Sequence, residues 1–158
     1  MSTKLASLFK QIAPDYPYQA LLAHLSAKFS QLDTNEFELR LSECLKFLYL
    51  RSLSGCGFIP LAGEVDAFWH EMILQTREYA AFCEALPSGE FIHHNSISLQ
   101  DHAEKITKEQ EVMRLLEWIP AYVQHFGHFN EETAKYWVIV KLLQCEFHYS
   151  LDDINQLV

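Results

Sequence analysis

The chain contains little glycine, proline or cysteine, few basic residues and no long hydrophobic run. Of its 158 residues, 5 are glycine, 5 are proline and 4 are cysteine, and the longest apolar runs are short ones such as 136–140. A membrane-spanning helix needs ~18 consecutive apolar residues, so we expect none here. Residues 1–9 also lack the continuous apolar region of a signal peptide, so we expect a cytoplasmic protein.

The cysteines form no motif. Cys44, Cys56, Cys83 and Cys145 are widely spaced and make no Cys-x-x-Cys pair. Four cysteines in a chain of this length are too few for a dense disulfide framework. We therefore expect reduced thiols, which agrees with a cytoplasmic location.

Basic residues are also scarce, since 12 lysines and arginines stand against 21 acidic residues, with a net charge of −9. Phosphate binding needs a basic face, so this charge argues against nucleic acid and acidic membranes as partners. The glycine-containing stretch 54–60 lacks the Gly-Lys-Ser/Thr of a phosphate-binding loop. The Gly-x-Ser-x-Gly motif of a nucleophilic serine is absent as well.

Hydrophobic residues, in contrast, make up 49 % of the chain, and nearly every long segment repeats them with the period of a helix. Asp33, Ser98, Asn130 and Ser150 have the sequence context of helix N-caps. The expected helices span 3–12, 18–32, 34–53, 63–85, 98–118 and 130–147, followed by a short terminal helix. The sequence thus predicts an all-α protein with a single compact domain over residues 1–158, a bundle of five to seven helices.

One segment, residues 64–95, combines a helical pattern with chemically active side chains. Its packing stripe, at i, i+3, i+4 and i+7 spacing, consists of Val65, Phe68, Trp69, Met72, Ile73, Thr76, Tyr79, Ala80 and Cys83. A second row along the border of this stripe contains Asp66, His70, Ile73 and Arg77. We expect this row to lie where the helix meets a cleft or the solvent.

Histidine is the unusual component, with 8 in the chain. Asp66 and His70 are four residues apart, so on a helix the carboxylate can hold one imidazole nitrogen as N–H. His93 and His94 follow a predicted turn, and we expect only one of them to face His70, because neighbours in an extended segment point in different directions. Such imidazoles and a carboxylate can bind Zn²⁺, Fe²⁺, Cu²⁺ or Mn²⁺. The alternative is a surface pair and two loop histidines with local hydrogen bonds.

The spacing of these residues resembles that of the glycine-rich domain-containing protein-like family of plants and bacteria. The matching positions are Asp66, Trp69, His70, Thr76, Tyr79, Cys83, His93 and His94. Relatives often carry a second histidine where this chain has Met72. The resemblance implies a polar or metal-binding site at His70, His93 and His94. It also implies RNA association in the plant members, which the acidic charge of this chain does not favour.

Several residues have both a functional and a structural interpretation. Cys83 lies within the packing stripe, so we expect a buried thiol, with a role as fourth metal ligand as the alternative. Trp69 is expected to anchor the core first and to offer a stacking surface second. Arg77 is placed either to clamp an anionic ligand or to pair within its own helix. The candidate ligand pocket therefore contains Asp66, Trp69, His70, Arg77 and Tyr79.

Two functions remain open. In the first, the protein is a non-enzymatic binding or interaction module for a protein or small ligand, and the Trp-His…His-His motif is a structural clasp. In the second, it is a metal-dependent enzyme that uses His70 with His93 or His94 to hold a transition-metal ion such as Zn²⁺ and to activate water or O₂. No complete catalytic constellation is visible, which favours the binding module. His24, His102 and His148 carry no motif.

Overall fold

The computed structural model describes residues 3–53, 59–94 and 114–157, and these ranges are helical, as predicted for an all-α protein. The helices that lie wholly within them are α1 (Thr3–Ile12), α2 (Gln19–Lys28), α3 (Thr34–Ser52), α4 (Gly63–Leu74), α5 (Thr76–Glu84), α7 (Trp118–Phe126), α8 (Glu131–Ala134), α9 (Val138–Phe147) and α10 (Leu151–Asn155). In this part of the chain no helix is long and apolar enough to cross a membrane.

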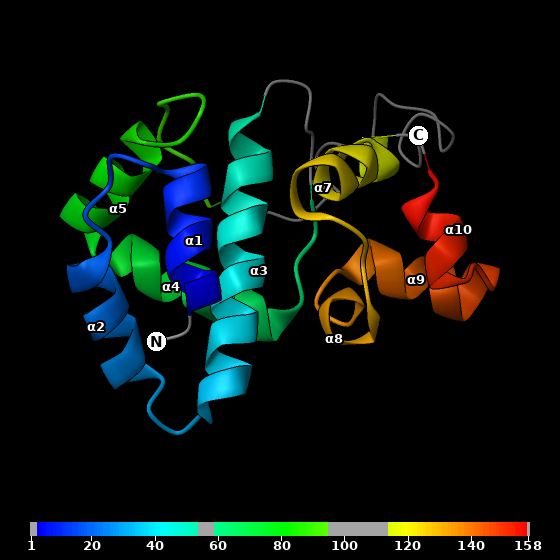
Figure 1. Ribbon diagram of the computed structural model, residues 1–158, viewed down its shortest axis with the longest axis horizontal. Coiled ribbons are helices and arrows are strands. Elements are labelled where there is room, and N and C mark those ends of the chain that lie inside the picture. Colours follow the sequence, from blue (N-terminus) through cyan, green and yellow to red (C-terminus); the bar gives the residue numbers. More distant parts are fainter. Residues whose placement is uncertain (1–2, 54–58, 95–113, 158) are drawn as a thin grey trace.

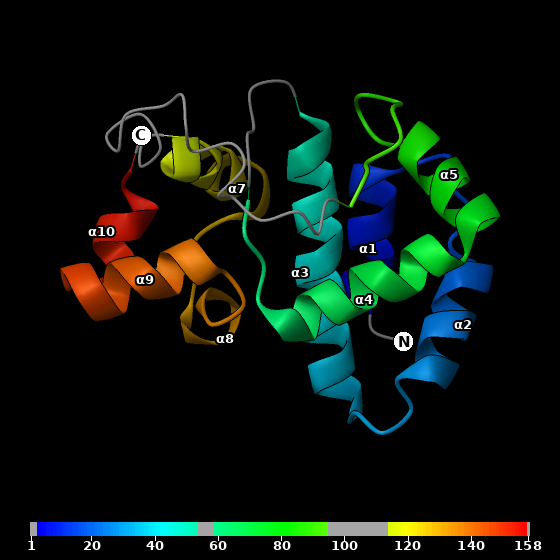
Figure 2. The ribbon, with the colours of Figure 1, turned by 180° about the vertical axis from the view of Figure 1, so that it is seen from behind.

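The helix α3 occupies the centre of the molecule. In Figure 1, α1, α2, α4 and α5 lie on one side of it, and α7, α8, α9 and α10 lie on the other. The view from behind in Figure 2 shows the same division, with α4 crossing α3. Because α3 has neighbours on several sides, it is apolar most of the way round, and Leu41, Cys44 and Leu48 have no exposed surface. Its sequence agrees with this position, because apolar residues recur on more than one side of the helix.

Three of the four predicted N-caps are confirmed, and the fourth, Ser98, lies outside the described residues. The Asp33 carboxylate accepts a hydrogen bond from the backbone N–H of Glu36 at 2.9 Å and begins α3. Asn130 and Ser150 each form a complete capping box, at the start of α8 and α10. Each cap satisfies backbone donors that the first turn of a helix leaves without an intrahelical acceptor.

The prediction of one continuous helix over 63–85 is wrong, because the chain breaks at Gln75. This residue has φ −86° and ψ 62°, which ends α4 and begins α5. The break lets two apolar faces pack against different partners. The Phe68 ring of α4 stacks on Phe29 with the centroids 3.9 Å apart. In α5, Phe82 packs edge-on against Phe9 of α1, with the centroids 6.4 Å apart.

The predicted helix 130–147 is also divided, into α8 and α9. Between them, Trp137 forms an antiparallel bridge with Leu61, and the N–H of Ala62 donates to the carbonyl of Tyr136 at 3.1 Å. This bridge anchors the start of α4. These two breaks, together with α7 (Trp118–Phe126), which begins where the predicted helix 98–118 was expected to end, explain why the described residues contain more helices than the five to seven predicted.

Most of the predicted helix 98–118 lies outside the described residues. A helical stretch over 114–116 ends in a turn at Glu117, and α7 begins at Trp118. Pro120 therefore lies in the first turn of α7, where its missing N–H costs no intrahelical hydrogen bond.

Candidate metal centre

The helix α4 presents Asp66 and His70 on successive turns. Asp66 lies in the first turn, where the helix dipole favours a carboxylate, and its N–H donates to the carbonyl of Ala62 at 3.0 Å. Met72, on another side of α4, is fully buried, in agreement with its place in the packing stripe. One side of the helix therefore enters the core, while the other carries the polar pair.

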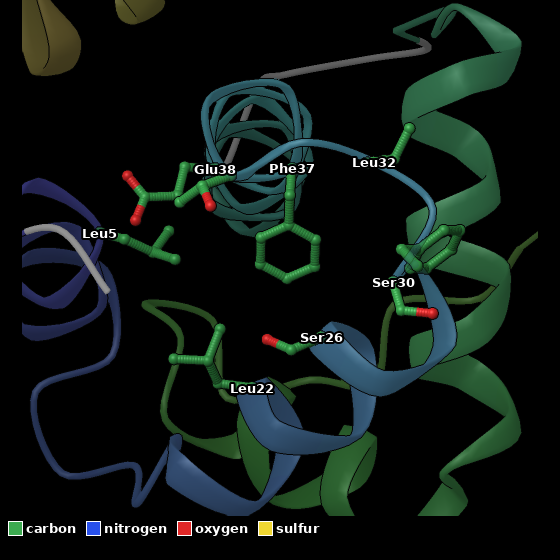
Figure 3. Close-up of a pocket in the computed structure, with 9 residues that line it drawn as sticks. Leu5, Leu22, Ser26, Ser30, Leu32, Phe37 and Glu38 are labelled. Atoms are coloured by element: carbon green, nitrogen blue, oxygen red, sulfur yellow. The ribbon is translucent and has the colours of Figure 1, made fainter.

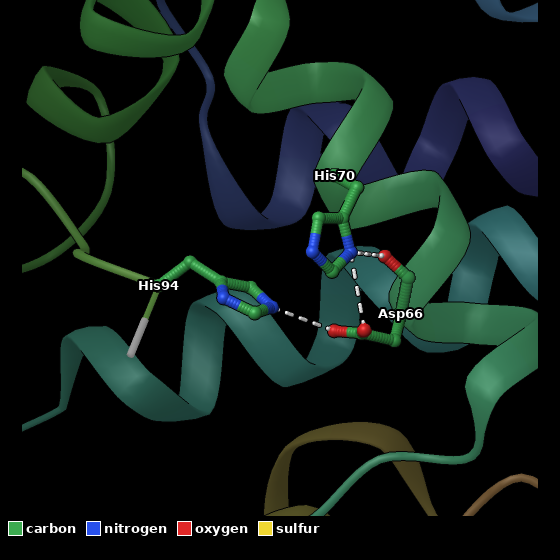
Figure 4. A group of neighbouring side chains, drawn as sticks. All are labelled: Asp66, His70 and His94. Atoms are coloured by element: carbon green, nitrogen blue, oxygen red, sulfur yellow. Dashed lines mark hydrogen bonds and ion pairs between the residues drawn. The ribbon is translucent and has the colours of Figure 1, made fainter. Parts of the chain in front are cut away.

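The carboxylate of Asp66 binds two imidazoles at once (Figure 4). Its Oδ1 lies 3.0 Å from Nε2 of His94, and its Oδ2 lies 3.1 Å from Nδ1 of His70. Nδ1 of His70 is also 3.0 Å from the backbone carbonyl of Asp66. Because both neighbours of this nitrogen are oxygen acceptors, Nδ1 carries the proton, and in the neutral ring Nε2 of His70 keeps its lone pair.

His94 reaches the group because the chain reverses after α5. The N–H of Gly89 donates to the carbonyl of Leu86 at 2.9 Å, and Gly89 has φ +65°, in the left-handed region that favours glycine. The predicted turn around Pro87–Gly89 is thus confirmed. Beyond it, Ile92 is buried, His93 is exposed and His94 points back toward α4.

Aromatic packing holds the imidazole of His94. Its ring centroid lies 4.3 Å from that of Trp69 and 4.2 Å from that of His70. Phe47 of α3 in turn packs against Trp69, with the ring centroids 4.8 Å apart. Trp69 is therefore both a core anchor and a stacking surface, the two roles considered for it from the sequence.

The group of Asp66, His70 and His94 is mostly shielded from solvent at His94 and exposed to solvent at His70. The exposed fraction of the side chain is 17 % for His94, 31 % for Asp66 and 54 % for His70. One ligand atom from each residue can be chosen so that all three lie within 4.8 Å of one another. Two imidazole nitrogens and a carboxylate oxygen form a donor set that suits Zn²⁺, Fe²⁺ or Mn²⁺.

The other candidate residues lie outside this group. His93 is exposed and, with Phe91, lines a separate cleft of about 650 Å³. Arg77 is exposed on α5, beyond the break at Gln75, so the row predicted along one helix does not continue to it. Tyr79 is fully buried and belongs to the core rather than to an open pocket.

Cys83 is buried in the core, as its place in the stripe predicts. Burial raises the pKa of its thiol, so the neutral form is favoured. A metal ligand must be a thiolate, and Cys83 is not part of the group formed by Asp66, His70 and His94. The geometry thus reduces the candidate ligand set to one carboxylate and two histidines.

Sequence reasoning missed two carboxylates with several partners each. Glu43 of α3 has no exposed surface and lies beside Lys46, Tyr122 and Trp137. Glu71 of α4 is 8 % exposed and bonds to α2. In the sequence, each of these glutamates stands at a position where the helical pattern calls for an apolar residue, which could have indicated a buried carboxylate. Its partners could not be predicted, because most of them lie far away in the sequence.

A cleft of about 360 Å³ lies between α1, α2 and the start of α3 (Figure 3). Leu5, Leu22 and Phe37 provide apolar walls, and Ser26 and Glu38 add polar atoms. The cleft shares no residue with the Asp66 group, so the two features are independent sites on the molecule.

Together, these features define an all-α protein in which a carboxylate from one helix joins two imidazoles. The chain belongs to the UCP032817-like family, whose model matches residues 10–131. This family has no assigned function. No curated protein and no solved structure matches the chain. The matched range includes Asp66, His70 and His94, so the candidate metal centre lies within the part that defines the family.

This assignment corrects the resemblance to the glycine-rich domain-containing protein-like family, which is wrong. The motif behind it was short, and much of it has a packing explanation. Trp69, Tyr79 and Cys83 are all buried, and any well-packed helix face needs residues of this kind. What the resemblance implied about RNA and metal therefore falls away, and the case for a metal site rests on geometry.

Proposed function

We propose that this protein is a binding domain that takes a divalent transition-metal ion through Asp66, His70 and His94. The observation that supports it is the convergence of one ligand atom from each residue within 4.8 Å. The residues come from two separate parts of the chain, the first turns of α4 and the segment after α5. A mixed nitrogen and oxygen donor set of this type is typical of Zn²⁺ and of non-haem Fe²⁺ sites.

Two of the three proposed ligand atoms already lie at a separation that suits a shared ion. Tetrahedral ligands at ~2.1 Å from a metal lie about 3.4 Å from one another. Nε2 of His94 and Oδ1 of Asp66 are already 3.0 Å apart. Nε2 of His94 now donates its proton to the carboxylate, so this proton must leave Nε2 before that nitrogen can bind the ion.

Three protein ligands leave at least one coordination position for water or for a further ligand. The side chain of His70 is 54 % exposed, which supports an open position on the solvent side of the group. A metal-dependent enzyme would need the same open position, since a metal ion can activate bound water. The three ligands support metal binding, whereas an enzymatic reaction would need further residues.

The cellular setting belongs to the same proposal. We place the protein in the cytoplasm, and the described cysteines Cys44, Cys83 and Cys145 are free, as a reducing compartment requires. The net charge of −9 argues against a nucleic-acid partner. A metal ion together with a small ligand or a protein partner fits this charge.

The direct test is the metal content of untagged protein, followed by titration with Zn²⁺ and Co²⁺ against a coloured chelator. We expect close to one ion per chain. Asp66→Asn, His70→Ala and His94→Ala should each weaken binding more than ~100-fold, because loss even of an outer-shell partner of a metal ligand costs about 10–100-fold. His93→Ala is the matched control, since it removes the neighbouring exposed imidazole and should leave affinity unchanged.

A metal content below roughly a tenth of an equivalent, with no rise in melting temperature on adding these ions, would refute the proposal. The group would then be the structural clasp of the first hypothesis, tying His94 to α4 through Asp66. In that case, His94→Ala would lower the melting temperature by the same amount with and without a chelator.

A further inference from the structure

A chain of hydrogen bonds leads from α4 to the backbone that carries His94. The indole Nε1–H of Trp69 donates to the hydroxyl of Tyr79 at 2.8 Å. That hydroxyl donates to the backbone carbonyl of Ile92 at 2.7 Å. Trp69, Tyr79 and Ile92 are all buried, so water does not compete for these bonds.

In each of these two hydrogen bonds, the donor and the acceptor are fixed by the chemistry of the groups. Indole Nε1–H is a donor and never an acceptor, so the oxygen of Tyr79 must accept from Trp69. Burial raises the pKa of Tyr79, which keeps its hydroxyl neutral and leaves it a single proton to donate. That proton points to the carbonyl of Ile92, which lies two residues before His94. The three groups therefore fix the distance between α5 and the returning segment.

Trp69 contacts the same segment a second time. Its ring lies 4.3 Å from the imidazole of His94, centroid to centroid. The indole is itself held by Phe47 and by its bond to Tyr79. The backbone before His94 and one face of its ring are thus fixed by groups that touch each other. We therefore expect the imidazole of His94 to be oriented toward Asp66 already in the metal-free protein.

We propose that Tyr79 is a positioning residue for His94, acting through the carbonyl of Ile92 and the indole of Trp69. This inference rests on the proposed metal function. Tyr79 contributes no ligand to the ion; its hydroxyl limits where the His94 imidazole can lie, so that Nε2 meets Oδ1 of Asp66. The result is a preorganised site, which lowers the entropic cost of assembling three ligands around an ion.

The test is Tyr79→Phe, which removes the hydroxyl and keeps the ring. We expect the affinity for Co²⁺ to fall by up to about 10-fold, because Tyr79 acts on His94 through the backbone, whereas loss of a group bonded directly to a metal ligand costs about 10–100-fold. The visible spectrum of bound Co²⁺ should also shift toward that of the His94→Ala variant. Tyr16→Phe is the matched control. The hydroxyl of Tyr16 donates at 3.1 Å to Glu78, the residue that precedes Tyr79 in the sequence. Removing this hydroxyl should leave the Co²⁺ affinity unchanged.

A double-mutant comparison separates positioning from general loss of stability. If Tyr79 acts through His94, then adding Tyr79→Phe to His94→Ala should not weaken Co²⁺ binding further. The same fold-loss in both backgrounds, or wild-type affinity in Tyr79→Phe alone, would overturn the inference while leaving the metal site standing.

A measurement on metal-free protein keeps the two proposals separable. The imidazole ¹⁵N–¹H NMR signals of His94 should move toward those of a solvent-exposed histidine in Tyr79→Phe, and stay in place in Tyr16→Phe. If the wild-type protein binds no ion, the metal function fails, and these signals still decide the role of Tyr79. Unchanged His94 signals in Tyr79→Phe would refute positioning.

Discussion

At the scale of the residue, Glu71 shows how α4 uses a second carboxylate–imidazole pair. Its Oε1 lies 2.7 Å from Nε2 of His24, and its Oε2 lies 3.3 Å from Nζ of Lys28, both on α2. The hydrogen bond with His24 is the main cause that lowers the pKa of Glu71; burial opposes this shift, and Lys28 adds to it. His24, which carried no motif, therefore has a structural partner.

The lowered pKa predicts how Glu71→Gln behaves with pH. A carboxyl group whose pKa is lower in the folded state stabilises the fold above its unfolded pKa, and this stabilisation is lost as the pH falls through the folded pKa. We expect Glu71→Gln to reduce the free energy of unfolding by about 1–2 kcal/mol at pH 6, because its partners are partly exposed and screened. By pH 3 the difference from wild type should shrink. Urea unfolding at both values measures it, with exposed Glu84→Gln as control; a constant difference would contradict the assignment.

At the scale of the element, Glu43 connects the central helix to the second group of helices. Its Oε1 accepts from Nζ of Lys46 at 2.6 Å, and its Oε2 accepts from the hydroxyl of Tyr122 at 2.9 Å and from Nε1 of Trp137 at 2.8 Å. Burial and the neighbouring carboxylate raise the pKa of Tyr122, so its hydroxyl stays a donor. One carboxylate thus joins α3, α7 and the residue before α9.

Removing this carboxylate should be costly. Glu43→Ala removes the carboxylate that pairs with Lys46, whose ammonium keeps the hydroxyl of Tyr122 as an acceptor, and leaves the donors of Tyr122 and Trp137 without their acceptor. Breaking a buried pair by removing one partner costs about 3–5 kcal/mol. Chemical unfolding of Glu43→Ala should show this loss, while Glu84→Ala at an exposed helix position should change stability by less than ~0.5 kcal/mol. A loss below about 1 kcal/mol for Glu43→Ala would mean that the two helix groups do not depend on this connection.

At the scale of the whole molecule, the two groups of helices share α3 (Figure 1). Trp69 lies in the first group, where it packs on Phe47. Trp118 and Trp137 stack in the second, with centroids 4.7 Å apart. Glu43 bonds to Trp137, and Phe47 contacts Trp69, so both groups are built on one helix. This shared core supports the proposal of a single domain.

A single domain should unfold in one step. With 5-fluorotryptophan in place of tryptophan, ¹⁹F NMR resolves Trp69, Trp118 and Trp137 as separate reporters during urea unfolding. We expect the same midpoint for all three, equal to that of the far-ultraviolet circular dichroism. An earlier transition at Trp118 and Trp137 than at Trp69 would divide the chain into two folding units and contradict the single-domain proposal.

The sequence by itself determined the helical class, the caps and the local part of the site. Period and capping are properties of neighbouring residues, so Asp33, Asn130 and Ser150 could be assigned without a structure. The pairing of Asp66 with His70 follows for the same reason, because residues four apart lie on one helix face.

Only the tertiary structure decided the rest. No proline or glycine near Gln75 predicts the break between α4 and α5. The break occurs because the two helices pack against different neighbouring helices. The choice of His94 over His93 depends on the burial of Ile92 and its bond to Tyr79, which set the side to which each following residue points. Because these contacts join positions far apart in the chain, they cannot be predicted from the local periodicity of the sequence.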